Sequence, residues 1–229
     1  MFNIVIPSYI FACFNYNHNM KELKARDAFK VIGESIKLWA DDWANQALVG
    51  LVAILCSFTI VLLPAATFGV FYQARDLARG NRSGLMGFWQ GFKSYFKQNL
   101  LWGIVNLLVY AFLIFVITFY WLSSDTLKSS VPLGIAGAFF TVLVFWSIWQ
   151  FLTLSCFFLQ DEPSMKLAWK NGWAIFVRLR SFSLTIGIIV FVFSLFSVLT
   201  FIPLVLAAEG LIAITGVRAV QATILPEQG

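Results

Sequence analysis

Four long apolar stretches divide the chain and predict membrane-spanning helices. They cover residues 47–63, 100–122, 131–159 and 182–202, with lengths of 17, 23, 29 and 21 residues. A helix needs about 20 predominantly apolar residues to cross the hydrocarbon core of a bilayer. Each stretch reaches this length or comes near it. The pattern therefore predicts an all-α fold, a multi-pass transmembrane helical bundle.

Two shorter apolar segments each begin with a proline, one from Pro64 to Ala78 and the other from Pro203 to Val220. Proline suits the first turn of a helix, so each proline can separate one helix from the next. If both segments cross, the bundle has about six membrane helices. The first segment is only about 23 Å long at 1.5 Å per residue. A full crossing therefore needs long side chains that extend to the interface, and the alternative is a segment that lies on the membrane.

The segment after Pro64 has the features of a short return helix. Ala65, Ala66 and Gly69 are small enough to let it pack closely on residues 47–63. Arg75 and Arg79 are spaced to share one helical face and are expected to anchor the segment at the interface. Asp76 directly follows Arg75, and we expect these adjacent side chains to lie on different faces.

The distribution of positive charge predicts the orientation. Of the 16 Lys and Arg residues, five lie in 21–37, five in 75–97 and four in 166–180, and the others are Arg218 and Lys128. A six-helix topology places all of them except Lys128 on one side. The positive-inside rule makes this side the cytoplasm, with both termini in it and the protein in a bacterial cell membrane. If the two short segments do not cross, the first five basic residues move outside.

Each of the three basic regions also carries an apolar stripe typical of an amphipathic helix in the interface. Lys93 and Lys97 point away from the second stripe and are further candidate interface anchors. The stripes comprise Ala25, Phe29, Ile32, Ile36, Trp39 and Trp43; Leu85, Phe88, Phe92, Tyr95 and Phe96; and Met165, Trp169, Gly172, Trp173 and Phe176. One interfacial helix followed by one hairpin would then occur three times, a candidate three-fold repeat in a single membrane domain of residues 20–229. Residues 1–19 are interpreted as an N-terminal extension, with Met20 as the natural start.

Composition narrows the function classes. Sixty per cent of the residues are hydrophobic, 12% are charged and the mean hydropathy is +0.82, so lipid is the expected solvent and partner. The net charge of +5 lies in short loops and does not indicate nucleic-acid binding. His18 is the single histidine, and the sequence contains no Walker A, His-Glu-x-x-His or Gly-x-Ser-x-Gly motif. We therefore expect a non-enzymatic protein without a cofactor or a metal.

One region of the chain resembles a known family. The sequence LPAATFGVFYQARDLARG, followed by GFWQGFKSYFKQNLLWGIVNLL, is similar to the YesL-like family of bacterial integral membrane proteins. The family has no established catalytic residues and its function is unknown. Its members are often associated with carbohydrate uptake and use. The resemblance therefore implies an accessory component of such a system, with other membrane proteins as partners.

Three polar residues within apolar stretches are candidate functional positions. Glu209 is ionisable and is either a proton- or ligand-binding group or a structural polar group near the surface. Asn106 and Gln150 are expected to hydrogen-bond between helices rather than line a path. The alternative function is a small membrane permease with a polar path near Glu209. The small-residue pairs Gly134 with Ala138 and Ser183 with Gly187 are expected to permit close helix packing.

Overall fold

The computed structural model describes residues 22–59, 61–127, 129–200 and 203–224. Within these residues every regular element is an α-helix, which confirms the all-α part of the predicted fold. The helices are α1 (Ala25–Asp41), α2 (Trp43–Ser57), α3 (Leu63–Ala78), α4 (Gly84–Ser94), α5 (Phe96–Leu127), α6 (Val131–Leu159), α7 (Met165–Arg178), α8 (Arg180–Thr200) and α9 (Pro203–Ile224). The predicted extension at residues 1–19, with His18, lies outside the described part.

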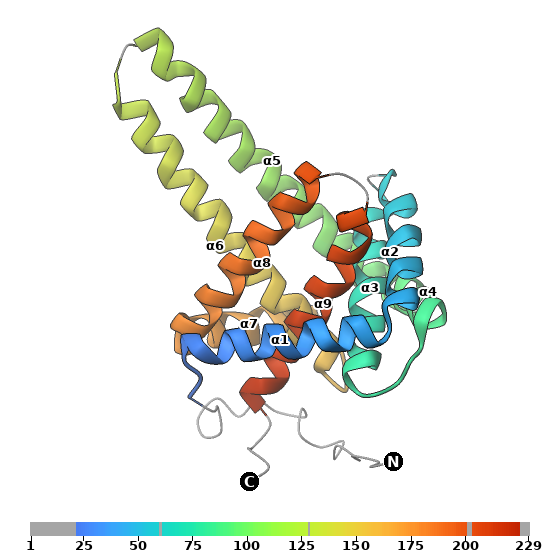
Figure 1. The fold of residues 1–229 in the computed structure, drawn as a ribbon. Coiled ribbons are helices and arrows are strands. Elements are labelled where there is room, and N and C mark those ends of the chain that lie inside the picture. Colours follow the sequence, from blue (N-terminus) through green and yellow to red (C-terminus); the bar gives the residue numbers. More distant parts are fainter. Residues whose placement is uncertain (1–21, 60, 128, 201–202, 225–229) are drawn as a thin grey trace.

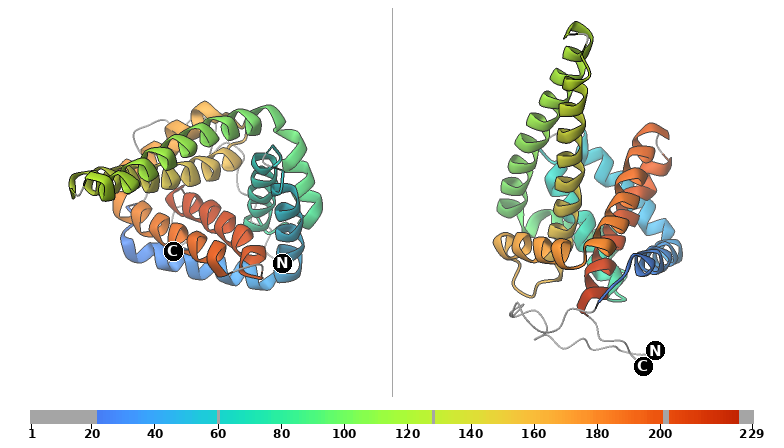
Figure 2. Two further views of the ribbon diagram at one scale, coloured as in Figure 1. Left: turned by 90° about the horizontal axis from the view of Figure 1, so that it is seen from above. Right: turned by 90° about the vertical axis from the view of Figure 1, so that its left-hand side faces the viewer.

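The helices form three pairs, and one further helix precedes each pair along the chain. The pairs are α2 with α3, α5 with α6, and α8 with α9, and the preceding helices are α1, α4 and α7. Helices α1 and α7 lie across one end of the molecule, whereas the hairpin of α5 and α6 extends far from that end (Figure 1). Seen from above, the three pairs lie on different sides of the molecule (Figure 2).

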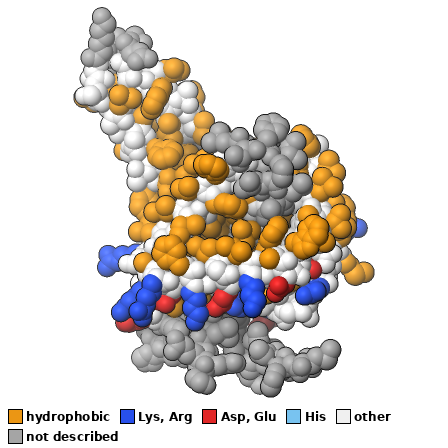
Figure 3. Space-filling view, in the orientation of Figure 1, with side chains coloured by type: hydrophobic (Ala, Val, Ile, Leu, Met, Phe, Trp, Pro, Cys, Tyr) orange, Lys and Arg blue, Asp and Glu red, His pale blue; other side chains and the backbone are white. Residues whose placement is uncertain are grey.

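The surface is divided into a charged end and an apolar body. Basic and acidic side chains form a band along the lower end, and hydrophobic side chains cover the face above it (Figure 3). We call the end that carries α1 and α7 the charged end. The side chains of Lys30 and Lys37 on α1, and of Lys24 directly before it, are exposed there. Leu107, Leu108 and Phe115 on α5 are 56–68% exposed, which suits a helix surrounded by lipid.

Three helical segments among the described residues are long and apolar enough to cross a membrane. They are Phe96–Ser124, Val131–Leu159 and Arg180–Ser197. The length and apolar composition of these three segments are typical of a membrane protein. The other helices of the pairs are α2, with 15 residues, α3, with 16, and α9, with 22. A total of about six crossings therefore stays a prediction.

The first predicted stretch ends earlier than its apolar pattern indicates. Helix α2 ends at Ser57, and α3 begins at Leu63 with Pro64 in its first turn. A proline inside a helix clashes with the carbonyl four residues before it, so one continuous helix could not run through this position. The hydroxyls of Ser57 and Thr59 also hydrogen-bond to nearby backbone carbonyls, which favours the end of a helix over its interior.

Helix α3 is an interior helix, and its closest packing differs from the expectation. Ala65, Ala66 and Gly69 are buried, and α3 does pack on α2. However, a Cβ added to Gly69 would lie 2.6–2.8 Å from ring and backbone atoms of Phe88 on α4. The small residue therefore permits the approach of α4 rather than of α2. The sequence pattern missed this because α4 looked like a purely interfacial helix.

The apolar stripe on α1 is only partly turned towards the protein. The buried positions on this helix are Ala28, Val31 and Ser35. In contrast, Phe29 is 62% exposed and Ile36 is 48% exposed. Small residues thus contact the other helices, while large apolar residues face outward. This arrangement suits a helix that touches both the protein and the membrane interface.

Candidate functional site

A buried network of amide and indole groups joins α5, α6 and α7. The Oε1 atom of Gln150 on α6 accepts a hydrogen bond of 2.8 Å from the indole Nε1 of Trp102 on α5. It lies 3.4 Å from Nδ2 of Asn106, also on α5, and 3.3 Å from the Nε1 of Trp169 on α7. Asn106 and Gln150 therefore hydrogen-bond between helices, as predicted.

Two further indoles extend this network. The Nε1 of Trp146 donates to Oδ1 of Asn106 at 3.0 Å, and the Nε1 of Trp149 donates to the backbone carbonyl of Trp169 at 3.2 Å. Because an unpaired polar group in lipid is costly, these bonds hold the three helices in a defined register. Nε2 of Gln150 has no hydrogen-bond partner in the described part of the chain.

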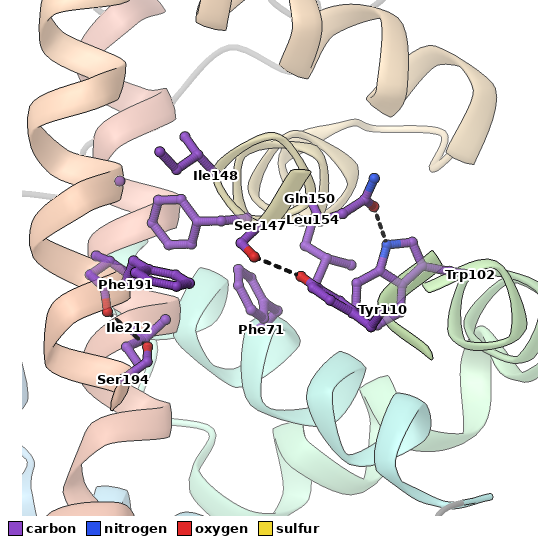
Figure 4. A pocket seen from close by; sticks show the side chains of 13 residues that line it. Phe71, Trp102, Tyr110, Ser147, Ile148, Gln150, Leu154, Phe191, Ser194 and Ile212 are labelled. Carbon is purple, nitrogen blue, oxygen red and sulfur yellow. Dashed lines mark hydrogen bonds between the residues drawn. The ribbon is translucent and has the colours of Figure 1, made fainter. Parts of the chain in front are cut away.

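A cavity of about 200 Å³ lies beside this network (Figure 4). Its walls come from all three helix pairs: Phe71 from α3, Tyr110 from α5, Ser147 and Leu154 from α6, Phe191 from α8 and Ile212 from α9. The Tyr110 hydroxyl and the Ser147 hydroxyl are 3.0 Å apart, and Ser147 in turn donates to the carbonyl of Leu143. Most of the wall is aromatic or aliphatic, so the cavity is an apolar space.

Trp102, Tyr110 and Ser147 were not predicted from the sequence as functional positions. A signal was nevertheless present, because Trp102, Asn106 and Tyr110 recur at intervals of four residues and so share one face of α5. That face packs on α6, where Trp146, Ser147 and Gln150 lie within five residues of one another. The abundance of aromatic residues elsewhere in the chain concealed this spacing.

Glu209 lies apart from the amide network. It is half-buried on α9, and it is not among the residues that line the cavity. The next residue, Gly210, packs against Gln46 of α2 and Trp39 of α1. The structure therefore does not bring Glu209 together with Asn106 and Gln150 in one polar path. Within the described residues, the Glu209 carboxylate has no hydrogen-bond or ion-pair partner.

The four candidate interface anchors differ in their surroundings. Arg75 forms an ion pair with Asp76, with a distance of 2.7 Å between Nη2 and Oδ1, and its guanidinium lies 3.8 Å from the ring centroid of Tyr72. The expectation that these two side chains lie apart is wrong, because the long side chain of Arg75 turns to meet the carboxylate of the next residue.

The remaining anchors are one arginine and two lysines, all of them exposed. Arg79 directly follows α3, and partial desolvation together with the positive charge of Arg75 lowers its pKa from the ordinary value of arginine. Lys93 and Lys97 are exposed, and the Nζ of Lys93 lies 5.9 Å from the ring of Trp89. All four residues lie at or near the ends of α3, α4 and α5.

The two pairs of small residues behave differently. Ser183 is buried, and a Cβ on Gly187 would lie 2.6 Å from side-chain atoms of Ile148, so α8 approaches α6 closely there. Gly134 and Ala138 are exposed, and no described atom lies within 4 Å of a Cβ added to Gly134. The first pair permits helix packing as predicted. The pair of Gly134 and Ala138 does not permit packing within this chain, because this part of α6 extends beyond the other two helix pairs (Figure 1).

The apolar helices and their buried amide network define a helical membrane protein of unestablished activity. A family model described as a protein of unknown function, DUF624, matches residues 20–122. The match covers less than half of the 229 residues, and it includes Trp102, Asn106 and Tyr110. Over this part the chain is similar to a family of unknown function, and the finer resemblance to YesL-like proteins stays a prediction. No curated protein and no solved structure was found to match the chain.

Proposed function

We propose that this chain is a non-enzymatic, multi-pass integral protein of a bacterial cell membrane that acts as an accessory component in carbohydrate uptake or utilisation. One observation supports an accessory role over a transport path. The amides of Asn106 and Gln150, which lie within apolar helices, are joined to each other and to three indoles. Polar groups engaged in this way hold helices together and do not line a route for a polar solute.

The carbohydrate part of the proposal rests on the resemblance to YesL-like proteins alone. The exposed apolar surfaces of α5 and α6 support contact with lipid or with other membrane proteins. In this reading the chain contributes a stable membrane scaffold, and a separate protein carries the substrate. Both termini and the charged end face the cytoplasm, in line with the distribution of Lys and Arg.

Two measurements on the same protein test this proposal. Cells that lack the protein should take up labelled carbohydrate more slowly than cells that contain it. The purified protein in liposomes should transport none of the same carbohydrates. Normal uptake by the cells without the protein would contradict the carbohydrate role, while uptake by the liposomes would contradict the accessory role.

A small permease is the second candidate, and Glu209 is the observation that favours it. An ionisable side chain that is half-buried in an apolar helix, without a partner among the described residues, is a candidate for binding a proton or a ligand. A permease of this kind should move protons or a solute across liposomes, and Glu209→Gln should abolish the flux. Glu34→Gln is not a suitable control because it breaks an ion pair, so Glu22→Gln, which changes an exposed carboxylate, serves instead.

A further inference from the structure

The cavity between the three helix pairs lies at a depth where lipid chains are found. Leu154 precedes the end of α6 at Leu159 by five residues, or about 8 Å along the helix. Tyr110 follows the start of α5 at Phe96 by 14 residues, or about 21 Å. Both distances are counted from helix ends that lie near the charged end, Leu159 of α6 and Phe96 of α5 (Figure 1). The cavity therefore lies within an apolar layer of about 30 Å.

The hydroxyls on the cavity wall are already used within the protein. Tyr110 and Ser147 hydrogen-bond to each other, and Ser147 donates to the carbonyl of Leu143. Ser194 donates to the carbonyl of Val190 at 2.8 Å. Figure 4 shows the Gln150 oxygen directed at Trp102. Among the described wall residues, Nε2 of Gln150 is the buried side-chain polar atom without a partner. A cavity with a single free polar group of this kind is a poor site for water, which needs two to four partners, and a good one for an apolar ligand.

Helix α8 carries both a part of the cavity wall and residues that face the lipid. Phe191 and Ser194 line the cavity, and the neighbouring residues Val192 and Leu195 are 53% and 48% exposed. An apolar molecule in the surrounding bilayer can therefore contact an apolar surface of α8 at the level of the cavity. The acyl chains of phospholipids are the apolar molecules that every bilayer supplies at this depth.

From these observations we propose that the cavity binds the terminal part of a phospholipid acyl chain. An apolar protein cavity of about 150 Å³ binds benzene, so a cavity of 200 Å³ has room for about eight carbon atoms by proportion. A bound chain would contact all three helix pairs and fill the space between them. This site is independent of the proposed accessory role and of any polar path near Glu209.

Photolabelling tests the proposal directly. The full chain is reconstituted in phosphatidylcholine vesicles that contain a phospholipid with a diazirine at the end of one acyl chain. After irradiation, the modified residues are located by mass spectrometry. Phe71 on α3 is 5% exposed and Leu154 on α6 is 3% exposed, so free lipid around the protein cannot reach them. We expect adducts on both residues in the native protein, in addition to adducts on lipid-facing Leu108.

Two variants that fill the cavity and one matched control complete the experiment. Ser194→Phe and Ile212→Phe add bulk inside the cavity from α8 and α9, and each should cause loss of the Phe71 and Leu154 adducts. Thr185→Phe is the control, because Thr185 makes the same kind of hydroxyl bond to the backbone of α8 but does not line the cavity. Labelling of Leu108 in every protein shows that it is inserted, and an unchanged thermal midpoint in detergent shows that it is folded. Native protein with adducts at Leu108 but none at Phe71 or Leu154 would overturn the proposal, as would adducts that persist in both filled variants.

Discussion

The guanidinium of Arg218 on α9 donates a hydrogen bond to the carboxylate of Glu34 on α1, with a distance of 2.6 Å between Nη2 and Oε2. The two residues are 184 positions apart in the sequence. The ion pair therefore ties the last helix of the described chain to the first one. Arg218 also lies 3.4 Å from the side-chain oxygen of Gln221, one turn further along α9.

Loss of this ion pair should destabilise the protein only modestly. The side chains are 27% and 42% exposed, and exposed ion pairs contribute about 0.2–1 kcal/mol. We expect Arg218→Gln or Glu34→Gln to lower the free energy of unfolding by about this amount, and the double variant to lower it little further. Thermal unfolding in detergent measures the effect, with Arg26→Gln on the exposed face of α1 as the control. Additive losses in the double variant would show that the two side chains act separately.

Replacement of Gly69 should disrupt the packing of α3 on α4. A Cβ at this position would lie 2.8 Å from the backbone oxygen of Phe88, which cannot move without shifting the helix. Such overpacking costs about 1–3 kcal/mol. Gly69→Ala should therefore lower the thermal midpoint and the monodisperse fraction in detergent. Gly137→Ala on α6, where no described atom lies within 4 Å, should leave both unchanged or improve them. Similar behaviour of the two variants would contradict the close approach.

Arg75→Lys should have a smaller effect than Gly69→Leu. Lysine keeps the positive charge beside Asp76, but it loses the planar guanidinium that lies over Tyr72 and contacts Asp76 through two nitrogens. We expect a loss of about 1 kcal/mol for Arg75→Lys. Gly69→Leu places a larger side chain against Phe88 and should greatly reduce the folded yield. The yields of the two variants, compared in detergent, check this order, and a worse result for Arg75→Lys would reverse it.

Gln150→Leu should destabilise the contact between α5, α6 and α7. Leucine has nearly the same size but leaves the indole groups of Trp102 and Trp169 without an acceptor. Each buried donor left unpaired costs about 1–3 kcal/mol. Thermal unfolding should show a clear loss for Gln150→Leu and almost none for Gln90→Leu, which changes an exposed residue of α4. Equal stability of the two variants would mean that the indoles find other acceptors.

The orientation of the chain is open to a direct test by cysteine labelling. In a background without Cys13, Cys56 and Cys156, single cysteines are placed at Ser129, Arg82 and Lys24, which are all exposed. An impermeant thiol reagent added outside the cell should label the cysteine at 129 and neither of the others. Labelling at 24 together with 129 would show that α3 does not complete a crossing.

The sequence by itself determined the all-α fold and the apolar helices, because these features depend on local patterns. A run of apolar residues longer than about 20 predicts a helix in lipid wherever it occurs. Pro64 and Pro203 marked the starts of α3 and α9 to within one residue, since a proline suits the first turn of a helix and disrupts its interior. The interhelical bonds of Asn106 and Gln150 were also predictable, because an amide in an apolar helix needs a partner.

Only the tertiary structure decided which helices meet and what lies between them. Gly69 faces Phe88 of α4, Glu34 pairs with Arg218, and the cavity takes its walls from three separate helix pairs. These contacts depend on how each helix is rotated and tilted, and a uniformly apolar helix does not encode its rotation in a hydrophobic stripe. The apolar lining of the cavity was hidden for the same reason, since its aromatic residues look in the sequence like those that face the lipid.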